Sequence, residues 1–194
     1  MTCTTNCIPL RVVCGIYIED AYSHYITSKK EAFAIFVDGS STIEGSDDNF
    51  TTTVYSKTFT ENAIEEIAVN HNYWRVTGGA KFVIGTIHNI DRPTYPYYFD
   101  KAVKSTDRET LGGRFYSKIN SVRRVSKMNW KLVHKDRVDN WRSWFDNSNS
   151  FRNPFAILDL MNDDVVLCTS TNDFPLQLDV SNLYGGSMEL TEYL

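Results

Sequence analysis

The sequence lacks the motifs that mark the common enzyme and metal-site classes. The four cysteines form no C-x-x-C pair, and the four histidines show neither H-x-H nor H-E-x-x-H spacing. No glycine-rich phosphate loop and no G-x-S-x-G elbow occurs. These absences exclude the usual zinc, P-loop and serine-hydrolase signatures, and we expect no bound cofactor.

Long hydrophobic runs are also missing. No window reaches the ~18–20 apolar residues of a transmembrane helix. The N-terminal stretch MTCTTNCIPLR has neither the charged region nor the long apolar region of a secretory signal. We therefore expect a cytoplasmic protein that is not secreted, located in the host cytoplasm or the virion if the protein is viral.

Alanine and leucine are scarce, at 8 and 11 residues, whereas the chain has 18 Thr, 16 Ser, 15 Asn and 15 Asp. Asn, Asp and Ser compete with the helical backbone for hydrogen bonds, and Thr is stiff at its first side-chain torsion. This composition favours strands joined by structured loops. It is also typical of proteins from AT-rich genomes, including many phage proteins. The length of 194 residues predicts a single domain.

Apolar runs predict several strands. The runs at 10–18 and 32–38 are apolar at successive positions, which is typical of strands buried on both faces, and the run at 80–88 also predicts a strand. Near the C-terminus, FAILDL and VVLCTS flank the turn sequence MNDD and predict a β-hairpin.

Helical spacing predicts three to four helices between these strands. A short helix is expected after Asp20, and a T-x-x-E capping box at Thr58 predicts another over 59–70. A third is expected between 107 and 127, and a fourth begins after Asp136. We therefore predict an α+β fold, with a mixed and largely antiparallel sheet.

Positive charge is concentrated in one aromatic-rich sub-region, residues 101–152. It contains thirteen basic and five acidic residues, a net charge of +8, whereas the rest of the chain carries −12. A cluster of Lys and Arg attracts phosphate groups and acidic protein surfaces. If these residues share a face, the sub-region predicts a docking surface for nucleic acid or an acidic protein. A plain solvated surface is the alternative reading.

The candidate docking residues are the basic ones outside the predicted apolar stripes. In the expected third helix that stripe is Phe115, Ile119 and Val122, and in the fourth it is Val138, Trp141 and Phe145. Trp144 is the aromatic that the stripe needs least, so it is the candidate for stacking on bases. The candidate docking residues are Arg114, Lys118, Arg123, Arg124, Lys127, Lys131, Lys135, Arg137, Arg142 and Trp144.

A second set of residues suggests catalysis. Asp38 ends a predicted strand, Glu65 and Glu66 lie on the predicted helix over 59–70, and Asp91 follows another strand. This arrangement resembles the carboxylate set of RNase H-like nucleases. The resemblance implies a site for Mg²⁺ ions that stabilise the oxygens of a phosphodiester during cleavage.

Two hypotheses follow. The first is a non-catalytic interaction protein that docks through residues 101–152, either a phage virion component or a phage factor acting on a host complex. The second is a Mg²⁺-dependent nuclease that uses the basic segment to hold its substrate. The absence of a dense catalytic motif favours the first hypothesis.

Overall fold

The computed structural model describes most of the chain. The described residues are 9–19, 23–27, 33–37, 39–60, 63–67, 71–78, 81–94, 99–110, 113–159 and 164–193.

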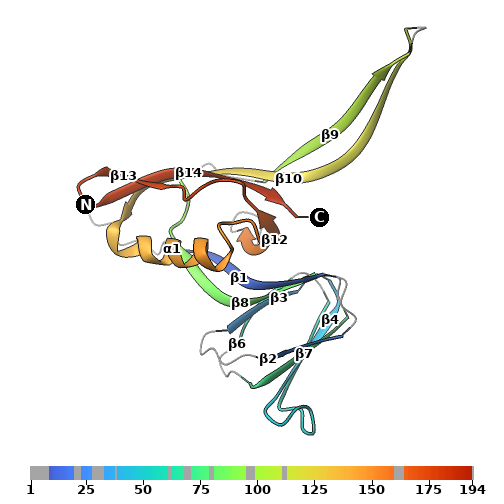
Figure 1. Cartoon of the computed structure of the whole chain (residues 1–194), viewed down its shortest axis with the longest axis vertical. Coiled ribbons are helices and arrows are strands. Elements are labelled where there is room, and N and C mark those ends of the chain that lie inside the picture. The colour runs from blue at the N-terminus through green and yellow to red at the C-terminus, as the bar shows by residue number, and fades with distance from the viewer. Residues whose placement is uncertain are drawn as a thin grey trace.

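The protein is mostly β-sheet, with 66% strand and 9% helix, so the predicted α+β class with three to four helices is wrong. The described chain contains one short α-helix, α1 (Val138–Asn147), preceded by a 3₁₀ turn, η1 (Lys135–Arg137) (Figure 1). No helix among the described residues combines the length and the apolar character needed to cross a membrane.

The described strands form two antiparallel sheets. The larger has ten strands, nine of which form a continuous order. That order is β6 (Ala63–Ile67), β3 (Phe33–Val37), β8 (Lys81–Ile90), β1 (Leu10–Glu19), β11 (Phe155–Asp159), β12 (Asp164–Thr169), β14 (Leu183–Glu192), β10 (Phe115–His134) and β9 (Asp100–Glu109). The tenth, β13 (Leu176–Val180), pairs with β14. The smaller sheet has the order β2 (Ser23–Thr27), β7 (Tyr73–Gly78), β4 (Ser41–Ser46) and β5 (Tyr55–Phe59).

Several strand predictions are confirmed. The runs at 10–18, 32–38 and 80–88 form β1, β3 and β8, and the predicted C-terminal hairpin is the β11–β12 pair. Strand β1 is buried on both faces, because Val12 and Val13 contribute to different hydrophobic clusters. A third cluster fills the space between the smaller sheet and the β3–β8 end of the larger one, around Trp74.

Three predicted helices are strands instead. The backbone after Asp20 forms β2, and the region of the Thr58 capping box forms β5 and β6. The third, between 107 and 127, becomes parts of β9 and β10. A helix as short as the one expected over 59–70 is marginal in water. Pairing of β6 with β3 instead places Ile64 opposite Phe36, against the hydrophobic cluster that Phe36 belongs to.

The fourth predicted helix is confirmed as α1, but its cap and its buried face differ from the prediction. Asp136 lies in η1 beside His134, and α1 has no side-chain cap. Trp141 and Trp144 are both fully buried, whereas Phe145 is only partly buried. Positions three apart and positions four apart both lie near one face of a helix, so spacing alone did not decide between Trp144 and Phe145.

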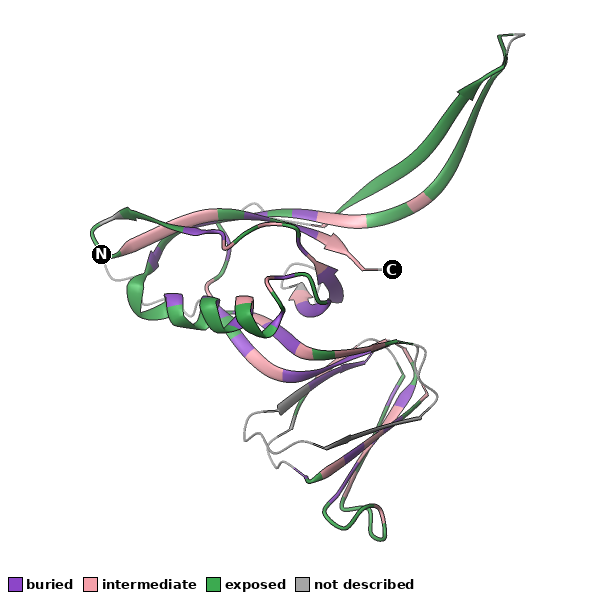
Figure 2. Cartoon of the chain, in the orientation of Figure 1, coloured by how far each residue is buried: buried purple, intermediate pink, exposed green. Residues whose placement is uncertain are grey.

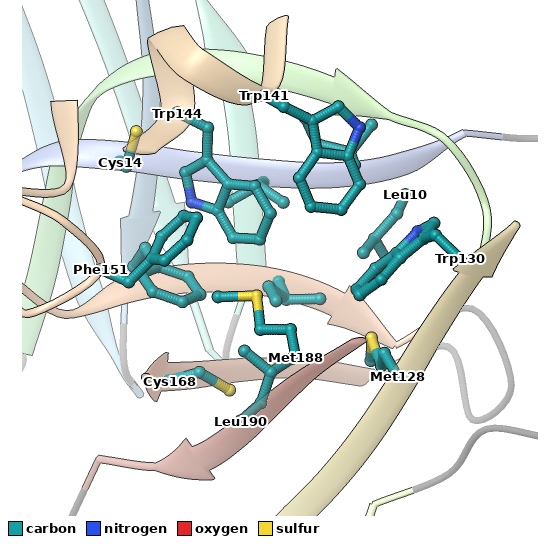
Figure 3. Close-up of a cluster of buried hydrophobic side chains, with 14 of the residues drawn as sticks. Leu10, Cys14, Met128, Trp130, Trp141, Trp144, Phe151, Cys168, Met188 and Leu190 are labelled. Carbon is teal, nitrogen blue, oxygen red and sulfur yellow. The ribbon is translucent and has the colours of Figure 1, made fainter. Parts of the chain in front are cut away.

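The core under α1 is rich in aromatic side chains. Trp141 packs edge-on against Trp130 of β10, with 4.7 Å between ring centroids, and Trp144 contacts Phe151 at the same centroid separation (Figure 3). Met128 and neighbouring side chains of β14 complete the cluster. This core fixes the proximal half of β10, from which the candidate site extends.

Candidate functional site

A two-stranded ribbon projects from the body of the molecule (Figure 1). Strand β9 pairs with the distal half of β10 from Asp100–Val125 to Glu109–Phe115. Strand β14 pairs with β10 only as far as Val125, so no third described strand joins the ribbon. We call residues 100–125 the arm. It carries seven basic and three acidic residues, a net charge of +4 within a chain of net charge −4.

The arm exposes both of its faces. Every residue of β9 is exposed, and so are most residues of β10 from Phe115 to Arg123 (Figure 2). Of the nine exposed large hydrophobic side chains in the described chain, five lie on the arm. They are Val103, Phe115, Tyr116, Ile119 and Val122.

One face of the arm, which we call the apolar face, carries four of its five exposed hydrophobic side chains beside the charged Lys101, Asp107 and Glu109. Residues paired across an antiparallel ladder lie on the same face, and Val103 is paired with Val122. Strand alternation and the bulge at Asn120 place Phe115 and Ile119 on this face too. Val122 and the buried Met128 lie on the same side of β10, because an even number of residues separates them along the strand. The apolar face therefore continues the core-facing side of the sheet beyond the elements that cover the core.

The other face is basic. It carries Lys104, Arg108, Lys118 and Arg123, together with the ring of Tyr116. None of these four cations forms an ion pair within the described residues. The row continues along the solvent side of β10 through two further exposed residues, Lys127 and Lys131. At about 3.4 Å per residue, Arg123 and Lys127 lie roughly 14 Å apart, whereas a helix would place them one turn apart.

An ion pair fixes the root of the arm. Arg124 donates from Nε to Oε1 of Glu192 at 2.8 Å, and its backbone N–H donates to Oε2 of the same carboxylate at 2.8 Å. Both side chains are partly buried. Glu192 thus holds β10 at the point where the β14 ladder ends, and Arg124 lies on the opposite side of the strand from Arg123.

The predicted docking residues do not form one surface. Lys118, Arg123, Lys127 and Lys131 share the basic side of β10, and Arg114 lies beside the tip of the arm. Four others lie elsewhere: Arg124 pairs with Glu192, Arg137 with Asp91 and Arg142 with Asp139, while Lys135 belongs to η1. Trp144 is fully buried and cannot stack on a base, so this part of the prediction is wrong.

The proximal end of β10 is irregular. A bulge between Trp130 and Val133 breaks the strand alternation there. Leu132 has a positive φ of 60° and is exposed, and Val133 is buried in its place. Trp130 and Val133 therefore face the core, and Lys131 faces solvent.

The carboxylates of the nuclease hypothesis are held apart by separate cations. Glu65 Oε2 lies 2.5 Å from Lys57 Nζ, and Glu66 Oε2 lies 2.9 Å from Arg11 Nη2. Asp91 pairs with Arg137. Asp38 lies outside the described residues, and the described part of the chain holds no group of three His, Cys, Asp or Glu residues that could bind a metal ion.

Other buried groups belong to the packing of the body. Burial lowers the pKa of His88 to about 4, so this histidine is neutral near neutral pH. It lies within hydrogen-bonding distance of the Asn147 amide on α1. Cys14 and Cys168 are buried in the hydrophobic core. None of these side chains lies on the arm.

Sequence reasoning missed Val103, Lys104, Arg108 and Tyr116 as site residues. The available signal was the Gly112–Gly113 pair, because Gly-Gly is typical of hairpin turns. Gly113 adopts a φ of 73°, which a turn at the arm tip accommodates. No protein-family model, curated protein or solved structure matches the chain. The candidate site therefore depends on the geometry of the arm alone.

Proposed function

We propose that this is a non-catalytic interaction protein that docks through its arm onto an acidic protein surface. The observation that carries the proposal is that both faces of the ribbon are exposed to solvent. The face around Ile119 is apolar, and the face around Lys118 is basic. A two-stranded hairpin is marginally stable by itself in water. A protein that covers the arm would stabilise it by removing its apolar face from solvent and pairing its cations.

The apolar face favours a protein over nucleic acid as the partner. Phe115 and Ile119 are 68% and 62% exposed, and exposed apolar patches are typical of protein-binding surfaces. A phosphate backbone would neutralise the basic face but would leave this apolar face in water. We propose a phage virion component or a phage factor acting on a host complex as the biological setting, in keeping with the composition.

Nucleic acid is the second candidate. The basic row on the arm favours it, because its cations have no ion-pair partner within the described part of the chain. A two-stranded β-ribbon fits the major groove of duplex DNA. Under this alternative, reversing the charge of Lys118 and Arg123 weakens binding to every sequence equally. Each lost phosphate contact would flatten the slope of log affinity against log salt by about 0.9 on duplex DNA. Titration of a labelled duplex at several salt concentrations measures this slope.

Site-specific photo-crosslinking tests the proposal. A benzoylphenylalanine replaces Ile119 on the apolar face, and cells that produce the protein are irradiated. We expect a covalent adduct with a protein other than this chain, and we expect it to withstand nuclease treatment. A matched variant carries the same group at Ser56, an exposed position on β5, and should give no such adduct.

Two results would contradict the proposal. An Ile119 adduct that nuclease removes would identify nucleic acid as the partner. Equal labelling from Ile119 and Ser56 would show that the arm is not the docking element. Circular dichroism of each variant establishes that the body remains folded.

A further inference from the structure

The outer edge of the arm is an open template for another strand. Strand β9 ends the order of the larger sheet, and no described strand pairs with its outer edge. The arm's bulge lies at Asn120 in β10, so β9 itself is regular over ten residues and contains no proline. Native proteins usually interrupt or cover such an edge, because its free N–H and C=O groups pair readily with another chain.

The ladder at the tip shows which groups face outward. The backbone N–H of Thr110 donates to the carbonyl of Arg114 at 2.9 Å. Hydrogen-bonded and non-hydrogen-bonded pairs alternate along an antiparallel ladder. The even-numbered residues of β9 near the tip therefore direct their backbone groups to β10. The odd-numbered residues direct theirs to the open edge, where a second strand could bond to them.

The order of charges along β9 is self-complementary. An antiparallel copy centred on Lys104 places Lys101 opposite Asp107 of the other copy, and Asp100 opposite Arg108. Two-fold symmetry makes each of these pairs occur twice, which gives four pairs of opposite charge. The single unfavourable pair is Lys104 with its own symmetry mate. Opposite charges directly across a ladder stabilise it, and like charges destabilise it.

Neighbouring registers are less favourable. A shift of one residue pairs all ten residues but places Lys101 opposite Arg108 and Asp100 opposite Glu109, so both kinds of charged pair bring like charges together. The register centred on Ser105 retains only the Lys101–Glu109 pair, which occurs twice. A one-residue shift also places the apolar face of one arm beside the basic face of the other.

We infer that two copies of this chain pair antiparallel along the outer edges of their β9 strands, with Lys104 at the two-fold axis. The product is a four-stranded ribbon in which the two apolar faces lie side by side, as do the two basic faces. A ribbon of four strands satisfies backbone groups that a two-stranded one exposes to water. This inference goes beyond the proposed function, because it concerns the edge of the arm, whereas docking on an acidic partner uses the faces.

A cysteine at the proposed axis tests the register. Residue 104 forms a non-hydrogen-bonded pair with its symmetry mate, in which the Cα atoms are about 4.5 Å apart, within the range of a disulfide. The purified full chain with Lys104→Cys should form a disulfide-linked dimer under mild oxidation. Ser105→Cys is the matched control, one residue along the same strand, and should form at least about tenfold less. The parent chain, oxidised in the same way, measures how much disulfide-linked dimer forms through its own cysteines.

A charge swap tests the pairing without a new bond. Lys101→Asp and Asp107→Lys each convert two attractive pairs into two repulsive ones, so each should weaken dimerisation about tenfold or more. The double variant restores opposite charges at the same positions. It should recover the parent affinity to within about threefold. Sedimentation equilibrium of the purified chains over a range of concentrations measures the dissociation constants.

Several outcomes would overturn the inference. It is wrong if the parent chain remains monomeric up to about 0.5 mM, or if Ser105→Cys forms more disulfide-linked dimer than Lys104→Cys. It is also wrong if the double variant dimerises no more tightly than the two single variants. Intrinsic tryptophan fluorescence reports on the body core in every variant. A monomeric chain that still gives a protein adduct from position 119 would leave the proposed function intact, so the two failures are distinguishable.

Discussion

The two halves of β10 belong to one continuous strand and have opposite environments. In the proximal half, Met128 and Trp130 are buried under α1. In the distal half, Ile119 and Val122 are 62% and 44% exposed, although they lie on the face that continues toward the core. Membership of one strand therefore does not determine whether a side chain is buried. Side chains of similar hydrophobicity are buried only where a second layer lies above them.

The energetic consequences of the two halves differ accordingly. The proximal half contributes to a cluster of interlocking aromatic rings, in which Trp141 touches both Trp130 and Trp144. Interiors of this kind are close-packed, so a lost side chain leaves a cavity. Exposed side chains on the arm have few neighbours in the described chain. Their substitution should affect association with other molecules more than folding.

The largest effect should come from the centre of the core. Trp141→Ala should destabilise the protein by about 3–5 kcal/mol, because it removes a fully buried indole between two other rings. Denaturant unfolding followed by circular dichroism measures the free energy of unfolding. A cost below about 1 kcal/mol would mean that the ring is not part of a close-packed core.

A matched pair of substitutions on β10 compares the two halves directly. Met128→Ala should cost about 2–5 kcal/mol, because the side chain is fully buried. Ile119→Ala, on the same side of the same strand, should change the stability of the body by no more than about 0.5 kcal/mol. The same unfolding experiment measures both values. Equal costs would contradict the contrast between the two halves.

A smaller effect than in the core should come from the junction between the halves. Glu192→Gln removes the charge from the carboxylate that binds Arg124 through two hydrogen bonds, and should cost about 1 kcal/mol. We expect hydrogen exchange at the root of the arm to accelerate while exchange in the core is unchanged. Glu189→Gln is the control, because Glu189 is exposed on the same strand. If both variants behave alike, Glu192 does not hold the arm.

Part of the fold could be predicted from the sequence. The runs that form β1, β3 and β8 are apolar at successive positions because both faces of these strands are buried. The helix α1 could also be found, because Val138 and Trp141 follow a helical period in a segment without glycine or proline. In these segments the local pattern and the tertiary environment favour the same structure.

The candidate site was only partly predictable. The excess of positive charge in residues 101–152 located the region, because charge composition does not depend on the fold. The spacing of Phe115, Ile119 and Val122 is compatible with a helix, and it is also compatible with a strand that carries a bulge at Asn120. Spacing alone therefore assigned these residues to a helix, and it placed Arg123 and Arg124 on one surface although the strand separates them.

Local sequence patterns encode the strands buried on both faces, the amphipathic helix α1 and the segregation of charge, because each depends on residues that are close in the chain. Which apolar stripe is covered depends on the tertiary structure. Trp144 is buried because β11 and the loop after α1 bring Phe155 and Phe151 against it. Ile119 is exposed because the ladder between β10 and β14 ends at Val125, before the arm begins. Burial depends on segments that are distant in the sequence, and no local pattern encodes their position.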